Sequence, residues 1–117
     1  MNKSLTLHLI KLNCYVTEEA DDDEVFLKMA GKKIWPVKEH YKSMKTGAIE
    51  LNLDIANLEQ GKMIIIELWD FDALSANDFM GTFKLIMDKP GGPFNTDLTI
   101  NKGKGDHARY NLEWKLL

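Results

Sequence analysis

The sequence predicts an all-β fold, an eight-stranded antiparallel β-sandwich that comprises the whole chain of 117 residues as one domain. Apolar and polar residues alternate with a period of two through most of the chain, which is typical of strands with one buried face. Turn residues separate these runs at short intervals. No segment has a helical period beyond a single turn, which we expect within 37–46.

The N-terminal half predicts four strands. Residues 5–12 form the opening strand, and residues 24–29 form the next, with one apolar face. Ala30-Gly31 suits a tight hairpin that leads into a strand at 33–37. A further run at 49–54 alternates Ile, Leu and Leu with Glu, Asn and Asp, so it also has one buried face.

The C-terminal half predicts a central strand and two others. Residues 63–69, M-I-I-I-E-L-W, are apolar on nearly both faces, which favours a central position in a sheet. Residues 79–85 follow, with Gly81 as a bulge or a point of close approach. Pro90-Gly91-Gly92-Pro93 is expected to break regular structure. A mobile connection at 102–105 then precedes a closing strand at 109–116.

Composition excludes several classes of protein. Hydrophobic residues make up 44% and charged residues 28%, which are ordinary globular values. No apolar run approaches the ~18 residues of a membrane span. A net charge of -3 disfavours nucleic-acid binding. Cys14 is the single cysteine, and His8 and Lys11 interrupt the only stretch resembling a signal peptide, so we expect a cytoplasmic protein.

Charge is strongly polarised along the chain. Residues 18–24 read E-E-A-D-D-D-E, and residues 70–78 add three aspartates, with no lysine or arginine in either segment. Residues 28–45 are basic, with six lysines against one glutamate. Each segment alone is typical of a solvated loop or face. The fold must nevertheless place one concentrated negative zone and one positive stretch.

The spacing of the second acidic segment indicates a cation site. Asp70 and Asp72 are two residues apart, so at a strand end their side chains share a face, and Asp78 can return from a loop to the same point. Oxygen ligands without His or Cys favour Ca²⁺ over Mg²⁺. Because Ca²⁺ takes about 6–8 oxygens, the acidic loop at 18–24 would have to contribute the remainder. An EF-hand is excluded because Leu74 stands where its third oxygen should be and the flanks are strands.

Here the sequence resembles a C2 domain, a calcium- and phospholipid-binding β-sandwich. I-I-I-E-L-W-D-F-D-A-L-S-A-N-D-F-M-G is similar to the central strand and third calcium loop of that family. The residues that match its pattern are Asp70, Asp72, Ser75, Asp78 and Gly81. L-T-L-H-L-I-K-L, a polar loop and D-E-V-F-L-K-M resemble the first calcium loop between its strands, with Asp23 as the aspartate. A-R-Y-N-L-E-W-K-L resembles the closing strand.

The resemblance implies a C2-like sandwich of permuted topology, in which the first strand leads into the metal loop. The Ca²⁺ ligands that it implies in the third loop are the carboxylates of Asp70, Asp72 and Asp78, the carbonyl of Phe71 and, peripherally, Ser75. In the first loop Asp23 would be a ligand. The other aspartate of that loop has no clear equivalent, so Glu18, Glu19 or Asp22 would substitute.

The implied function is calcium-dependent docking on anionic phospholipid membranes. Clustered carboxylates repel anionic lipid until Ca²⁺ cancels their charge, and Leu74 at the tip of the third loop suits shallow insertion. The basic residues that would contact lipid headgroups are Lys32, Lys33, Lys42 and Lys45. The alternative is that these lysines form a solvent-exposed strand edge that discourages aggregation. With one loop incomplete, we expect a calcium affinity of ~10⁻⁴–10⁻³ M.

Two other functions stay open from the sequence. A metal-independent adaptor or subunit would bind a protein partner, with Trp35 as a candidate contact unless it belongs to the core. An enzyme is disfavoured because His8, His40 and His107 share no ligand spacing and no nucleophile or phosphate-loop motif is present.

Overall fold

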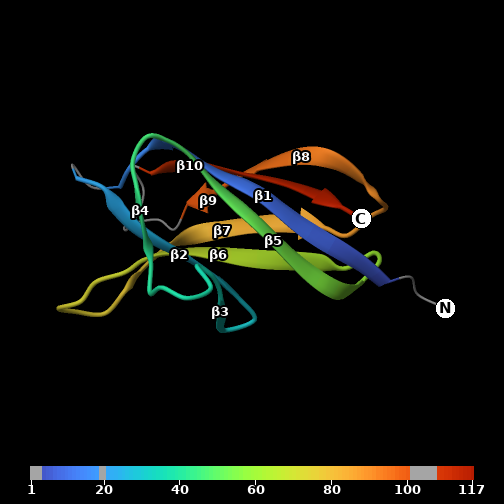
Figure 1. Cartoon of the computed structure of the whole chain (residues 1–117), viewed down its shortest axis with the longest axis horizontal. Coiled ribbons are helices and arrows are strands. Elements are labelled where there is room, and N and C mark those ends of the chain that lie inside the picture. The colour runs from blue at the N-terminus through green and yellow to red at the C-terminus, as the bar shows by residue number, and fades with distance from the viewer. Residues whose placement is uncertain (1–3, 19–20, 101–107) are drawn as a thin grey trace.

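The computed structural model describes residues 4–18, 21–100 and 108–117, which form ten strands and no helix. Sheet A has the order β5 (Gly47–Glu59), β1 (Ser4–Val16), β10 (Arg109–Leu116) and β8 (Gly91–Asp97). Sheet B has the order β3 (Lys32–Trp35), β2 (Asp23–Met29), β6 (Met63–Asp70), β7 (Asp78–Ile86) and β9 (Thr99–Ile100), and β4 (Lys42–Met44) also pairs with β2. All pairings are antiparallel, which confirms the predicted all-β sandwich (Figure 1).

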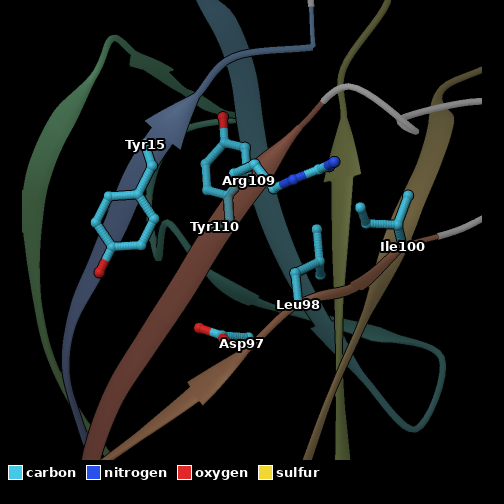
Figure 2. Close-up of a pocket in the computed structure, with 6 residues that line it drawn as sticks. All are labelled: Tyr15, Asp97, Leu98, Ile100, Arg109 and Tyr110. Atoms are coloured by element: carbon cyan, nitrogen blue, oxygen red, sulfur yellow. The ribbon is translucent and has the colours of Figure 1, made fainter.

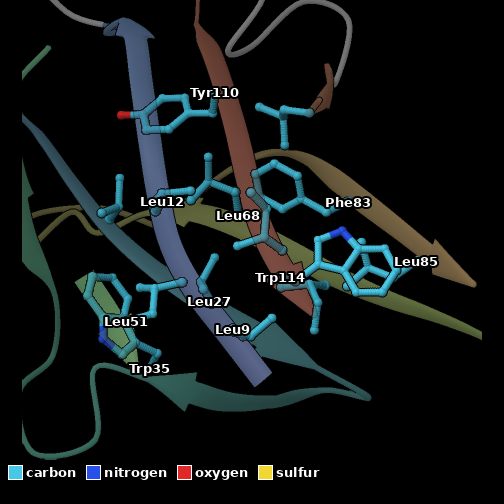
Figure 3. Close-up of a cluster of buried hydrophobic side chains, with 14 of the residues drawn as sticks. Leu9, Leu12, Leu27, Trp35, Leu51, Leu68, Phe83, Leu85, Tyr110 and Trp114 are labelled. Carbon is cyan, nitrogen blue, oxygen red and sulfur yellow. The ribbon is translucent and has the colours of Figure 1, made fainter. Parts of the chain in front are cut away.

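The core lies between the inner faces of the two sheets (Figure 3). Alternate residues of β1, β6, β7 and β10 point into it, as the period of two predicts. Fully buried side chains include Leu7, Leu9, Leu12, Ile66, Leu68, Phe83, Leu85 and Leu112. Burying each such side chain stabilises the fold by ~1.5–3 kcal/mol, so this face-to-face packing is the main source of stability.

The first strand lies beside the last. β1 pairs with β10 along nearly its whole length and leads directly into the acidic loop that precedes β2. On its other side β1 pairs with β5, which contains two extra residues, Asn52 and Asn57, both with positive φ. Such bulges increase the twist of an edge strand and make it a poorer template for pairing with another chain.

Two glycine-dependent features that the sequence predicts are confirmed. Ala30 and Gly31 form the β2–β3 hairpin turn, with φ of 51° and 80°, the left-handed pair that such two-residue turns require. Gly81 in β7 has φ of 153°, and a Cβ atom there would lie 2.2 Å from the carbonyl oxygen of Thr99. Gly81 therefore allows the close approach of β9 to β7.

Three local expectations were wrong or incomplete. Residues 90–93 do not break the structure, because Gly91–Asp97 forms edge strand β8, where Pro93 removes no hydrogen bond from the sheet interior. Residues 37–46 contain bends and β4 instead of a helical turn. Ten strands replace the expected eight, and β4, β8 and β9 have no counterpart among the runs that the alternation predicts. The connection expected at 102–105 and His107 lie outside the described residues.

In the described part of the chain, no helix is long and apolar enough to cross a membrane.

Candidate functional site

The strand register brings three of the predicted aspartates to one rim of sheet B. Asp70, the last residue of β6, is opposite Asp78, the first residue of β7. Asp70 is also opposite Val25 of β2, and Asp23 lies two residues before Val25 on the same face. All three side chains therefore lie on the inner face of sheet B. Figure 1 shows the 71–77 loop projecting from this end of the sandwich. We call these three residues with Asp72 the acidic rim.

Asp70 joins the ends of β6 and β2. Its side chain is nearly buried, and its Oδ1 accepts a 2.9 Å hydrogen bond from the backbone N–H of Glu24. The backbone N–H of Phe71 in turn donates to the carbonyl oxygen of Glu24 at 2.7 Å. This reciprocal pair fixes where β6 ends and the 71–77 loop begins, so the carboxylate of Asp70 has a defined position at the rim.

Asp23 is fully buried and links both sheets. Its two oxygens accept hydrogen bonds from the backbone N–H of Glu18 at 3.1 and 2.9 Å, and Oδ2 also accepts from the hydroxyl of Tyr110 in sheet A at 2.5 Å. Burial raises the pKa of Tyr110 above its ordinary value, and the adjacent Asp23 carboxylate raises it further. Asp23 thus anchors the first acidic loop through a buried network, a role that no sequence pattern indicates.

Glu18 and Asp22 flank this anchor. The Oε2 atom of Glu18 is buried and has no hydrogen-bond partner among the residues that the structure describes. Such an atom carries the desolvation cost of a carboxylate, which a donor or a cation at that point would offset. Asp22 is partly buried directly before β2. Glu19, the third candidate of this loop, lies outside the described residues.

The 71–77 loop is organised around Asp72. Its Oδ1 accepts from the backbone N–H of Leu74 at 2.9 Å, and its Oδ2 accepts from the Ser75 hydroxyl at 2.6 Å. The backbone N–H of Asp72 donates to the side chain of Asn77 at 2.8 Å, a contact that the sequence analysis missed although Asn is a common loop-stabilising residue. Leu74 is 97% exposed at the tip of the loop.

Aromatic rings pack together at the start of the 71–77 loop. Phe71 stacks on His40 and Tyr41, with ring centroids 5.7 and 5.0 Å apart. A hydrogen bond to Glu24 and the charge of that carboxylate raise the pKa of Tyr41. The segment before β4 therefore packs against the start of the 71–77 loop. The sequence contains no periodic signal for this contact, because it depends on how two connections cross.

The predicted headgroup lysines do not form one cluster. Lys32 and Lys33 lie at the β2–β3 hairpin, where Met29 pairs with Lys32, at the opposite end of β2 from Asp23. Lys33 donates to the backbone oxygen of Glu39, and Lys42 forms an ion pair with the Glu39 carboxylate at 2.8 Å. Lys45 directly follows Met44, the partner of Asp23 in β4. Lys42 is opposite Val25, which is itself opposite Asp70, so Lys42 and Lys45 are the two of the four on the side of the acidic rim.

The geometry of the acidic rim sets what it can bind as it stands. Within residues 4–18, 21–100 and 108–117, no group of three His, Cys, Asp or Glu side chains is already placed to hold a metal ion. Asp23, Asp70 and Asp72 instead accept hydrogen bonds from the chain's own N–H and O–H groups. The arrangement is that of acidic loops preorganised by protein donors, close together but not closed around a cation.

A pocket of about 320 Å³ opens beside the acidic rim, where the chain crosses from β8 to β9 (Figure 2). It is lined by Tyr15, Asp97, Leu98, Ile100, Arg109 and Tyr110. Asp97 accepts a 2.8 Å hydrogen bond from the side chain of Asn111, and Arg109 donates to the backbone oxygen of Ala108. These two contacts stay within sheet A, whereas the hydroxyl of Tyr110 donates to Asp23 of sheet B.

Neither a protein-family model nor a curated protein matches the chain. Among solved structures, the chain is similar to a C2 domain of a plant extended synaptotagmin 1, with a TM-score of 0.57 and 16% sequence identity. The match covers 97% of this chain and 92% of that domain. At this identity the likeness shows the fold alone. The protein therefore has a C2-like β-sandwich fold.

Proposed function

We propose that this chain is a non-enzymatic, C2-like binding module. Its acidic rim takes up Ca²⁺ and then docks peripherally on anionic phospholipid membranes, at the cytoplasmic face. The observation that carries this proposal is the register that sets Asp70 opposite Asp78, with Asp23 on the same face of the neighbouring strand. Like charges directly opposite each other in a sheet are destabilising, and a divalent cation relieves that repulsion.

The residues present fit a hard, oxygen-liganded cation only in part. Asp70, Asp72 and Asp78 would hold Ca²⁺, with the carbonyl of Phe71 and, peripherally, Ser75. The first loop would contribute Glu18 and Asp22, because Asp23 is fully buried and three hydrogen bonds already occupy its oxygens, whereas Asp72 is partly exposed. The buried Oε2 atom of Glu18 supports this assignment. When bound, Ca²⁺ would supply the positive charge that offsets the acidic rim and attracts lipid phosphate.

The chain's own residues would set how the module meets the membrane. The hydrogen bonds that Leu74 and Ser75 donate to Asp72 hold the 71–77 loop in a conformation that projects Leu74 outward. Burying one leucine contributes only ~1.5–3 kcal/mol, which is too little for stable attachment alone. Lys45, beside the acidic rim, would add ~1 kcal/mol near an anionic surface. Attachment therefore requires that the negative charge of the rim be neutralised first.

Calcium titration of wild type and an Asp70→Asn/Asp72→Asn variant tests the proposal. We expect calorimetry and amide chemical shifts of the wild type to report binding at ~10⁻⁴–10⁻³ M, confined to the two acidic loops. Neutralising two ligands should remove this binding. Asp88→Asn is the matched control, because Asp88 is exposed at the end of β7 away from the acidic rim.

Co-sedimentation with vesicles then tests membrane docking. We expect wild type and Asp88→Asn to sediment with phosphatidylserine vesicles only when Ca²⁺ is present, and not with phosphatidylcholine vesicles. The Asp70→Asn/Asp72→Asn variant should stay in solution in both cases. Absence of calcium binding in the wild type at millimolar concentration contradicts the metal site, and calcium-independent sedimentation contradicts the charge switch.

A metal-independent protein-interaction module is the second candidate. It is favoured by the finding that the described carboxylates do not already form a metal-holding group. The candidate contact Trp35 does not carry it, because that side chain is buried in the core (Figure 3). Under this alternative, the Asp70→Asn/Asp72→Asn variant should bind its protein partner as the wild type does. Under the first proposal, the same variant should lose binding to lipid vesicles.

A further inference from the structure

The outer face of sheet B carries exposed apolar side chains along its central strands. Met63, Ile65 and Trp69 of β6 point away from the core, alternating with the buried Ile66 and Leu68. Ile86 of β7 is opposite Met63 and extends the same surface. Met63, Ile65 and Ile86 are 52%, 44% and 49% exposed. We call Met63, Ile65, Trp69 and Ile86 the outer stripe.

Nothing in the described chain covers the aliphatic end of the outer stripe, whereas its aromatic end is packed. Trp69 stacks on Phe26 of β2 with ring centroids 6.2 Å apart and contacts Phe79 of β7 at 5.3 Å. Phe26 is only 7% exposed as a result. Contiguous exposed apolar side chains on one face are typical of a protein interaction site, whereas scattered ones are ordinary. Met63, Ile65 and Ile86 are of the contiguous kind.

Lysines outnumber carboxylates on the outer face around the stripe, with Lys28, Lys33 and Lys84 against Glu24 and Glu67, and Lys28 is opposite Glu67. Lys84 is opposite Ile65 in the β6–β7 pairing, and Lys28 lies over the Trp69 ring with its Nζ atom 4.9 Å from the ring centroid. Lys33 is opposite Lys28 in the β2–β3 pairing. The carboxylate of Glu67, between Ile65 and Trp69, accepts a 3.1 Å hydrogen bond from the indole N–H of Trp69. An occupant with carboxylates beside an apolar surface would be complementary.

The position of β6 and β7 decides the form of that occupant. β6 and β7 pair with each other along the whole stripe, whereas β2 covers β6 only at residues 67–70 and β9 covers β7 only at Gly81 and Thr82. The apolar side chains project from the face of the β6–β7 pair, so an occupant that covers them lies on that face and not along a strand edge. An apolar sheet face of this kind packs against an amphipathic helix. From Met63 to Trp69 the stripe runs about 20 Å, the length of a helix of about 13 residues.

We propose that the outer stripe is a docking surface for an acidic amphipathic helix of a partner protein. The apolar side of that helix would cover Met63, Ile65 and Ile86, and its flanking carboxylates would face Lys84 and Lys28. A second copy of this chain is disfavoured, because a two-fold contact would bring the same lysines together. The residues that the helix would cover, Met63, Ile65 and Ile86, lie toward the other end of β6 from Asp70, so docking there does not depend on calcium.

The test uses a helix-stabilised synthetic peptide of about 14 residues, with leucines three and four residues apart and glutamates on both flanks. Amide chemical shifts and the fluorescence of Trp69, the most exposed of the three tryptophans, report binding. We expect shifts confined to the outer face of β6 and β7. Ile65→Ser/Ile86→Ser should weaken binding about tenfold or more. Val16→Ser, a matched change of a 46% exposed residue in sheet A, should leave binding unchanged.

A charge-reversal experiment distinguishes specific binding of the peptide from nonspecific hydrophobic adsorption. Lys84→Glu should weaken binding of the acidic peptide and create binding of a peptide with lysines in place of the glutamates. Thermal unfolding confirms that each variant is folded. The proposal is overturned if the wild type does not bind the acidic peptide, or if Ile65→Ser/Ile86→Ser binds it equally well. It is also overturned if these substitutions instead abolish self-association or calcium-independent binding to phosphatidylserine vesicles.

Discussion

At the residue scale, Asp23 shows how position decides the role of a carboxylate. In the sequence, Asp23 is one of six acidic residues within 18–24. In the structure it is fully buried, and Glu18 and Tyr110 satisfy its oxygens with N–H and O–H donors. A buried charge is stable only with such partners. Asp23 therefore anchors the first acidic loop, and the remaining acids of that loop are the ones available for a cation.

Substituting Tyr110→Phe tests this anchor. Removing a hydrogen bond to a buried charged group should lower the free energy of unfolding by about 1.5–3 kcal/mol at neutral pH. Chemical denaturation of the variant and of Tyr15→Phe measures the loss. Tyr15 is the control because it is 59% exposed, so its variant should unfold like the wild type. An equal loss in both variants would contradict the anchoring role.

The same tyrosine predicts a response to alkaline pH. Burial raises the pKa of Tyr110 in the folded state above the unfolded value of about 10, so above that pH the unfolded chain releases a proton that the folded chain keeps. Stability should be unaffected by this group below pH ~10 and should fall above it. Tyr110→Phe should show a shallower alkaline loss than the wild type, measured by denaturation across that range.

At the element scale, pairing overrides local propensity where the two disagree. Pro90-Gly91-Gly92-Pro93 contains strong turn signals, yet residues 91–97 form β8 because Phe94 pairs with Trp114 and their rings lie 4.8 Å apart. The indole N–H of Trp114 also donates to Thr96. These contacts join residues that are distant in sequence, so no local sequence pattern predicts them. In contrast, the alternation in β2 and β10 predicts both the strand and its buried face correctly.

Gly81→Ala tests the close approach of β9 to β7. The added Cβ atom would lie 2.2 Å from the carbonyl oxygen of Thr99, so β9 must shift away. Gly47→Ala is the matched control, because Gly47 also has a positive φ, of 137°, but open space where its Cβ would lie. Thermal unfolding should show a larger loss of stability for Gly81→Ala, by more than ~1 kcal/mol. Equal losses would mean that backbone strain alone matters there.

At the scale of the whole molecule, the acidic rim and the aliphatic residues of the outer stripe lie toward opposite ends of β6. Asp70 of the rim ends the strand directly after Trp69, whereas Met63 begins it. The strand between them spans about 23 Å, and the molecule is elongated, with a longest extent of 47 Å. One module would thus contact a membrane at one end and a protein helix on the face near its other end.

This separation predicts that the two binding events are independent. Met63, Ile65 and Ile86, which the peptide would cover, lie toward the other end of β6 from Asp70, so the two events should couple weakly and saturating calcium should change the affinity for the acidic peptide less than about twofold. Peptide titrations with calcium and with a chelator measure the coupling. A large change in either direction would mean that the 71–77 loop and the outer stripe share a structural transition.

The sequence by itself determined the fold class, the faces of the main strands and the two acidic segments, because alternation and charge are local properties of the chain. Only the tertiary structure decided how those segments are used. The β6–β7 register placed Asp70 opposite Asp78, and sheet packing brought Tyr110 to Asp23 across 87 positions. Contacts of this kind depend on which strands pair and how the two sheets pack, and these are set by the free energy of the whole core.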